Sequence, residues 1–198
     1  MDLGDPRIPP GGPAEIGRVN HTIARLIGAA TGGGPPNIFT TLGRHRRLFR
    51  RWLRFASGLM PGGTLPRQDS ELLILRVAHN TGCDYEWHHH ERLGAAAGLS
   101  RERIELVRHG PTADGWTERQ ALLLRAADEL HADRVLTSEL WDELRPLLRD
   151  EQLIELCLLV GHYEMLAMTL NSLQVQPDRL PEGPPSRVSR LLQRAASR

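Results

Sequence analysis

The chain has 198 residues, a length that suits one domain with a sizeable core and terminal extensions. Its 25 basic residues, all of them arginine, nearly balance 24 acidic ones, and a net charge of +1 argues against nucleic acid or another strongly charged partner. Two cysteines are too few for a secreted disulfide framework, and neither a signal peptide nor an apolar window long enough for a membrane span is recognisable. We therefore expect a cytoplasmic protein with no membrane partner.

Helical periodicity runs through most of the sequence. Residues 1–15 are rich in proline and glycine and should be irregular. Beyond them, apolar spacing and helix breakers predict helices over 16–30, 37–59, 70–80, 83–97, 101–108, 117–131, 138–148 and 151–173. Asp69, Ser70, Thr117 and Ser138 are candidate N-caps, Gly98 should close its helix, and Pro146 should end or kink another. No strand pattern appears, so the fold class is all-α.

The predicted helix over 37–59 carries a cluster of arginines that could in principle hold phosphates. The cluster comprises Arg44, Arg46, Arg47, Arg50, Arg51 and Arg54, and it alternates with Leu48, Phe49, Trp52, Leu53 and Phe55. This alternation is typical of an amphipathic helix with a solvated basic face and a buried aromatic face. Because no nucleic-acid-binding motif accompanies it, we favour that interpretation.

The segment from Glu71 to His90 is the richest in chemical groups. Cys83, Glu86 and His90 stand at about 0°, 300° and 340° on the predicted second helix, so they share one face. A carboxyl and an imidazole four residues apart on a partly buried helix suit general acid and base chemistry near neutral pH. Cys83 at the helix N-terminus would meet the positive end of the helix dipole, which favours the thiolate.

Other interpretations of these residues stay open. Glu86 and His90 could form only an i, i+4 ion pair that braces the helix. Cys83, Glu86 and His90 are also metal-ligand types, although the adjacent His88 and His89 cannot face the same ion from a helix and are expected at the surface. Cys157 lies in the apolar run LIELCLLVG and is expected to be a buried small hydrophobe.

The segment contains a glutamate, eleven further residues, and then the pattern Cys-x-x-Glu-x-x-x-His. This arrangement resembles the motif of the carboxymuconolactone decarboxylase and AhpD-like superfamily. Upstream and downstream segments over roughly 35–178 are similar to its extended members. The resemblance implies an AhpD-like helical domain with a helical-hairpin pseudo-repeat, here Glu71–Gly94 and Glu151–Gln174, and association as trimers or hexamers. The expected organisation is an extension over 1–35 with a short helix, a helical domain over 36–178, and a tail over 179–198.

Glu86 stands where the superfamily's peroxidases have their second cysteine, so the Cys-x-x-Cys redox chemistry of that branch is not expected. The resemblance therefore points to the decarboxylase branch, with no cofactor and no metal. It implies catalytic roles for Glu86, His90, Cys83 and Glu71. The residues expected to contact a small-molecule substrate are Arg76, Trp87, His162 and Tyr163.

Three functions follow from these residues. The favoured one is a cofactor-independent decarboxylase, lyase or isomerase acting on a small carboxylated or enolisable molecule, in which Arg76 could grip a carboxylate. The second is a thiol-dependent peroxidase or oxidoreductase that uses Cys83 alone. The third is a non-catalytic binding or assembly protein that keeps the pocket. Each of them is expected to act as a homo-oligomer.

Overall fold

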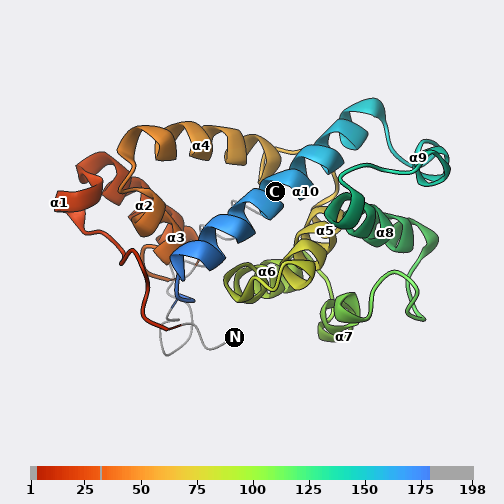
Figure 1. Ribbon diagram of the computed structural model, residues 1–198, viewed down its shortest axis with the longest axis horizontal. Coiled ribbons are helices and arrows are strands. Elements are labelled where there is room, and N and C mark those ends of the chain that lie inside the picture. Colours follow the sequence, from red (N-terminus) through yellow and green to blue (C-terminus); the bar gives the residue numbers. More distant parts are fainter. Residues whose placement is uncertain (1–3, 32, 179–198) are drawn as a thin grey trace. The chain divides into compact units, whose positions relative to one another are not determined.

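Helices make up all the regular structure in the part of the chain that the structure describes (Figure 1). The computed structural model describes residues 4–31 and 33–178, which form ten α-helices and one 3-10 turn without a strand among them. The predicted all-α fold class is therefore confirmed. The predicted C-terminal tail, residues 179–198, lies outside the described residues.

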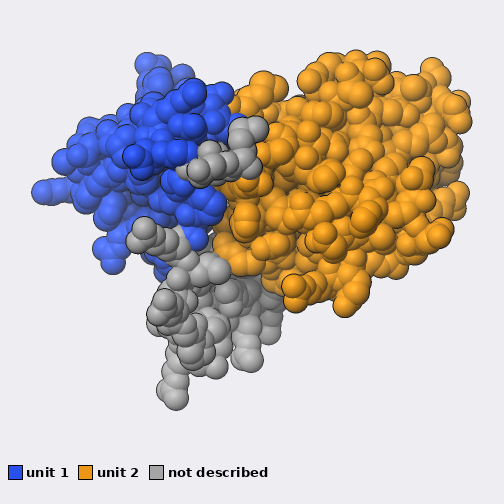
Figure 2. Space-filling view, turned by 60° about the horizontal axis from the view of Figure 1, so that its bottom comes forward, with its two compact units in different colours: residues 1–61, 170–198 blue, residues 62–169 orange. Residues whose placement is uncertain are grey.

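The chain divides into two compact units, coloured separately in Figure 2. One comprises residues 1–61 and 170–198, and the other comprises residues 62–169. The predicted domain boundaries after residues 35 and 178 stay a prediction.

The first unit contains α1 (Pro13–Ile16), α2 (Arg18–Thr31), α3 (Asn37–Leu42) and α4 (Arg46–Leu59). Two expectations fail here: α1 begins within the stretch expected to be irregular, and the helix expected over 37–59 is broken between α3 and α4. The break falls at Gly43, where a Cβ would lie 2.6 Å from the carbonyl oxygen of Phe39. That approach is too close for any residue but glycine.

Helix α4 is amphipathic, as predicted, but its apolar residues are not all covered. Phe49 is buried and packs against Phe39 and Trp52 at ring-centroid distances of 6.0 and 5.8 Å. Leu48 and Phe55 are exposed. Two arginines of the cluster donate to backbone carbonyls, Arg44 to Pro9 and Arg46 to Glu15 and Ala14.

The second unit contains the remaining helices, apart from residues 170–173 at the end of the last one, which belong to the first unit. They are α5 (Arg67–Asn80), α6 (Asp84–Ala96), α7 (Arg101–Leu106) with the 3-10 turn Val107–His109, α8 (Glu118–Asp133), α9 (Ser138–Leu144) and α10 (Asp150–Leu173). Thr117 caps α8 in a capping box, Gly98 follows α6 with φ of +97°, and α9 ends before Pro146, all as expected. Two other expected caps are wrong. Thr137 rather than Ser138 caps α9, and α5 begins at Arg67, ahead of Asp69 and Ser70.

Helix α5 is the core helix of this unit and packs against both α6 and α8 (Figure 1). The consecutive residues Leu72, Leu73, Ile74 and Leu75 have at most 1% of their surface exposed. A helix that is apolar on every side must be covered on every side. Glu71 precedes this run, so its carboxylate is carried into the interior, at 0% exposure.

The segment Glu151–Gln174, predicted as the second hairpin of a pseudo-repeat, forms the single continuous helix α10 instead, since no proline interrupts it. It is also the one helix among the described residues long and apolar enough to cross a membrane, and 61% of its most apolar window is buried inside the protein. Burial of that extent is typical of the core helix of a globular fold. The expectation that Cys157 is buried is wrong, because its side chain is exposed on α10.

Candidate active site

A tight turn between α5 and α6 brings the chemical groups of the two helices together. Gly82 adopts a φ of +59°, and the amide of Cys83 donates to the carbonyl oxygen of Ala78 at 2.9 Å. The reversal lays α6 along α5, and Gly94 lies close to Glu71: a Cβ added to Gly94 would lie 3.7 Å from the Cβ of Glu71. Glu71, Glu86 and His90 therefore face one another in the interior.

His90 lies between two carboxylates. Its Nδ1 is 2.7 Å from Oε2 of Glu71, and its Nε2 is 3.4 Å from Oε2 of Glu86. All three side chains are at most 5% exposed. Burial by itself lowers the pKa of His90, but the charge and hydrogen bond of Glu71, with a further contribution from Glu86, outweigh it and raise that pKa to about 9. At neutral pH the residue is therefore an imidazolium.

Neither Oε1 of Glu71 nor Oε1 of Glu86 accepts a hydrogen bond from a described residue, and the two glutamates differ in the cation that lies beside this oxygen. Oε1 of Glu71 forms an ion pair with Arg67 at 2.9 Å, an i, i+4 contact that the sequence interpretation missed although the spacing could have revealed it. Oε1 of Glu86 is buried and has no hydrogen-bond partner among the described residues. An acceptor left unpaired in the interior is costly. Glu86 is therefore the carboxylate with an acceptor oxygen that neither a hydrogen bond nor an ion pair of the described residues engages.

Tyr163 of α10 reaches the same cluster, as predicted. Its ring meets that of His90 edge-on, with centroids 5.0 Å apart and an interplanar angle of 88°. Burial, followed by the negative charges of Glu86 and Glu71, raises the pKa of Tyr163 well above its usual value, so its hydroxyl stays protonated. His162 packs edge-on against Tyr163 at 5.3 Å, and burial lowers the pKa of His162 to about 4.

Cys83 precedes α6 as its N-cap and is 1% exposed. The predicted preference for the thiolate is wrong. Burial raises the pKa of Cys83 to about 12, because the loss of hydration outweighs the hydrogen bonds from the backbone of Glu86 and Tyr85. Both cysteines of the chain are free.

Two residues expected to contact substrate are engaged elsewhere. The guanidinium of Arg76 forms a bidentate pair with Asp128 at 2.6 and 2.9 Å and also donates to the carbonyl oxygen of Val107. Trp87 belongs to a buried apolar cluster, and the guanidinium of Arg108 covers its ring at 3.6 Å. Both side chains therefore hold the helices together, and the structure does not bring them to His90.

The neighbouring histidines of the run have separate surroundings. His88 is exposed and its Nδ1 donates to the carbonyl oxygen of Asp84 at 2.6 Å. His89 is half-buried rather than fully at the surface, with its ring stacked on Tyr85 at 6.4 Å, and burial lowers its pKa to about 3. Across residues 4–31 and 33–178, no group of three or more histidine, cysteine, aspartate or glutamate side chains is arranged to hold a metal ion.

The helical fold and the buried histidine–carboxylate cluster on α5 and α6 lie within the part of the chain that is similar to known proteins. Residues 46–129, which contain both helices, match the Carboxymuconolactone decarboxylase family. The predicted resemblance to the carboxymuconolactone decarboxylase and AhpD-like superfamily is thereby confirmed. No curated protein matches the sequence.

Several solved structures share the fold at low sequence identity. A peroxidase-related protein with an alkylhydroperoxidase AhpD core from Ralstonia eutropha JMP134 is 18% identical, covers 86% of this chain and 93% of its own, and gives a TM-score of 0.74. A peroxidase-related protein from Silicibacter sp. TM1040 is 15% identical. The match covers 88% of this chain and 94% of that protein, with a TM-score of 0.76. The apo debrominase Bmp8 is 16% identical. The match covers 96% of this chain and 97% of that protein, with a TM-score of 0.69. Likeness at these identities shows the fold alone.

Proposed function

We propose that the protein is an enzyme that moves protons on a small carboxylated or enolisable molecule, as a decarboxylase, lyase or isomerase without a cofactor. The observation that carries this proposal is the unpaired, buried Oε1 of Glu86 beside the imidazolium of His90. A proton acceptor and a proton donor next to each other, both shielded from water, are the two groups that such a reaction needs.

The geometry supports a separate role for each group. The separation of 3.4 Å between Nε2 of His90 and Oε2 of Glu86 exceeds the usual N–H···O distance, so the Nε2 proton is only loosely held and can pass to a substrate oxygen or carbanion. Oε1 of Glu86 accepts the proton that the substrate releases. Glu71 holds the opposite ring nitrogen, which fixes the orientation of the imidazole and keeps it charged.

Thiol chemistry is the competing function, since peroxidase-related proteins and a debrominase share the fold. A buried Cys83 with a pKa near 12 is a poor nucleophile at neutral pH, because the thiolate rather than the thiol reacts. Its only possible intramolecular partner, Cys157, is exposed on α10 while Cys83 is 1% exposed. These observations favour proton transfer over a disulfide cycle.

The cluster could instead serve only to hold α5 and α6 together. A measurement of enzymatic turnover distinguishes this structural role from a catalytic one. An ion pair that is purely structural would give no turnover with any substrate, and its removal would change stability alone. Free thiols fit a reducing compartment, which supports a cytoplasmic location as part of the same proposal. A small-molecule substrate and the absence of nucleic-acid and membrane partners are proposed on the same basis.

The test uses a panel of small carboxylated lactones and β-keto acids in D₂O, with loss of CO₂ and incorporation of deuterium followed by NMR. We expect turnover by the native protein, and losses of about 10²- to 10⁴-fold in His90→Ala and Glu86→Gln. Cys83→Ser is the matched control and should keep substantial activity. Cys83-dependent consumption of a hydroperoxide with an external dithiol, without turnover of the panel, would overturn the proposal.

A further inference from the structure

Helix α4 presents an exposed row of arginines. Arg47, Arg50, Arg51 and Arg54 are all exposed and follow one another at intervals of three, one and three residues, which is the spacing of a single helix face. At 3.6 residues per turn they fall within roughly 100° of the helix circumference. Phe49, on the other side of α4, is only 1% exposed. We call the four exposed residues the arginine face.

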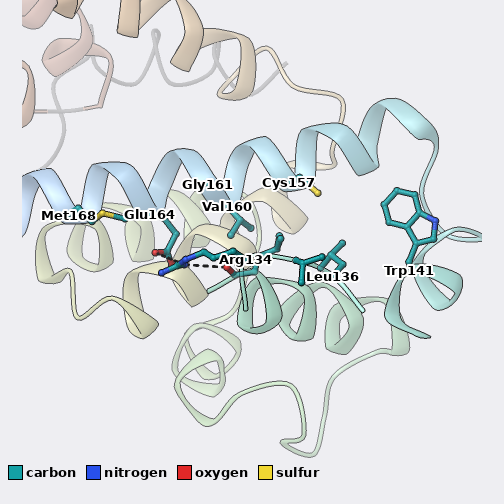
Figure 3. Close-up of a pocket in the computed structure, with 10 residues that line it drawn as sticks. Arg134, Leu136, Trp141, Cys157, Val160, Gly161, Glu164 and Met168 are labelled. Carbon is teal, nitrogen blue, oxygen red and sulfur yellow. Dashed lines mark hydrogen bonds and ion pairs between the residues drawn. The ribbon is translucent and has the colours of Figure 1, made fainter. Parts of the chain in front are cut away.

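The arginine face has no acidic partner among the described residues. Residues 4–61 hold nine arginines and only two acids, and none of these arginines forms an ion pair with a described residue. In residues 62–169, by contrast, eight of the eleven arginines are paired with an acid. Figure 3 shows one of these pairs, Arg134 with Glu164 at 3.5 Å, beside a groove. The net charge of +1 therefore averages over a region whose positive charge is unmatched.

The arginine face works against the stability of its own helix. Like charges three and four residues apart repel, as Arg47 does with Arg51 and Arg50 with Arg54. Arg46 and Arg47 also stand in the first turn, at the positive end of the helix dipole, and no acid accompanies them. Each helix from α5 to α10 has an acid in its first turn. Residues that break a local rule in this way are typical of a functional surface.

Two exposed apolar side chains border the arginine face. Leu48 is 56% exposed and Phe55 is 46% exposed, and they lie seven residues apart on the same side of α4. Arg51 lies between them in the sequence and about 40–60° away around the helix. A repeat of seven residues is the period at which one helix packs along another. The surface therefore combines an apolar seam with a row of cations beside it.

Neither a phosphate backbone nor a bilayer matches both features. Phosphates would pair with the arginines but leave Leu48 and Phe55 in water. A bilayer takes up the apolar face of an amphipathic helix, and in α4 that face is turned inward, with Phe49 at 1% and Leu59 at 6% exposure. A second helix that carries both acids and apolar residues matches the arginine face and the apolar seam together.

We propose that α4 binds an acidic amphipathic helix of a partner protein, whose carboxylates pair with the arginine face and whose apolar residues cover Leu48 and Phe55. A guanidinium can hold a carboxylate through two parallel hydrogen bonds, which fixes the register of the two helices. Helix α4 has 14 residues and is about 21 Å long, so the contact is smaller than the roughly 800 Å² per partner of a standard interface. The partner therefore binds transiently, with an affinity that depends on salt.

The first experiment measures the binding of a labelled synthetic helix by fluorescence anisotropy. The peptide has three heptads, with leucine once in each heptad, glutamate three and four residues after it, and alanine elsewhere. The native protein should bind it with a dissociation constant in the micromolar range, and raising the ionic strength from about 0.05 to about 0.5 M should weaken binding at least about tenfold. A control peptide with glutamine in place of each glutamate should not bind. Equal binding of the two peptides, or binding of neither, would overturn the proposal.

The second experiment locates the contact with variants of the protein. Arg51→Glu should weaken binding of the glutamate peptide by about tenfold or more, because it sets a carboxylate against carboxylates. Leu48→Ser should weaken binding by about threefold or more, because the apolar seam is reduced. Arg101→Glu, at an exposed position of α7, changes the net charge equally and should leave binding unchanged. An equal loss in Arg101→Glu, or no loss in Leu48→Ser, contradicts the proposed contact.

A measurement of stability separates binding from a structural role. Arg51→Glu replaces the repulsions with Arg47 and Arg54 by attractions, so its midpoint of urea unfolding should equal or exceed that of the native protein while binding is lost. A lower midpoint would make Arg51 a structural residue and overturn the proposal.

The other possible occupants of the surface are tested with the same variant and peptide. The mass of Arg51→Glu by light scattering should equal that of the native protein, and a smaller mass would mean that a second copy of the chain covers α4. At about 0.15 M salt, neither polyuridylic acid nor phosphatidylserine vesicles should displace the peptide. Displacement by either would replace the acidic helix by nucleic acid or by a membrane, and so would refute the proposal.

Discussion

Nδ1 of His90 lies 2.7 Å from Oε2 of Glu71, across 19 residues of sequence and with neither side chain more than 5% exposed. The contact joins α5 to α6 through a charge-assisted hydrogen bond in the interior. It orients the imidazole, sets its protonation state, and adds to stability in a way that depends on pH.

The first prediction concerns that pH dependence. The pKa of His90 is raised from 6.5 to about 9 in the folded protein. Its contribution is therefore fully present below pH 6.5 and is lost as pH rises through about 9. Urea unfolding of the native protein should show a fall in stability across this interval that His90→Gln lacks. Equal slopes for both proteins would contradict the raised pKa.

The second prediction separates the two carboxylates. Glu71→Gln removes the largest favourable interaction of the His90 imidazolium, so the pKa of His90 should fall by more than one unit. Glu86→Gln should lower it less, because the contact to Glu86 is longer, at 3.4 against 2.7 Å. The imidazole signals, followed by NMR as a function of pH, give both values. A larger fall in Glu86→Gln would reverse the roles assigned to the two residues.

The third prediction concerns thiol reactivity. Iodoacetamide at pH 8 should label Cys157 at least tenfold faster than Cys83, since Cys157 is exposed and burial raises the pKa of Cys83 to about 12. Peptide mass spectrometry assigns the label, and Cys157→Ser should leave a chain that is labelled slowly. Rapid labelling of Cys83 in the folded protein would revive the thiol mechanism.

The fourth prediction tests whether Arg76 is structural. Arg76→Met breaks a bidentate pair with Asp128 that is only partly exposed, so the free energy of unfolding should fall by about 1–3 kcal/mol. KM for any substrate should be unchanged. Arg145→Met, which breaks the exposed pair with Asp150, is the control and should change stability by less than about 0.5 kcal/mol. A raised KM at native stability would return Arg76 to the substrate site.

Local sequence patterns were enough to predict the helical class, the α5–α6 turn and the shared face of Glu86 and His90. These depend on spacing and on turn residues, which act over a few positions. Arg76 and Trp87 were assigned to the site because their chemistry fits, but their partners Asp128 and Arg108 lie far along the chain, and spacing on one helix carries no information about them.

The exposure of Cys157 could not be predicted for a different reason. Its helix is apolar on every side, so periodicity does not indicate which face meets the core. The break at Gly43 was missed because a single glycine is tolerated within a helical pattern, and its close approach to the carbonyl oxygen of Phe39 is not visible in residue spacing. Helix α5 begins at Arg67, before the expected cap Asp69. Asp69 forms an ion pair with Arg119 at 2.7 Å instead, a contact with a distant residue that local sequence does not reveal.

Arg67, Glu71, His90 and Glu86 form a row in which positive and negative groups alternate, beginning at a 40% exposed arginine and ending at a buried carboxylate. The row contains two cations and two anions, so its net charge is zero. An anionic substrate beside Glu86 would add one negative charge to the row, and the imidazolium of His90 is the buried cation that offsets it. Because that cation is lost as pH rises through about 9, binding of a carboxylate should weaken over the same interval.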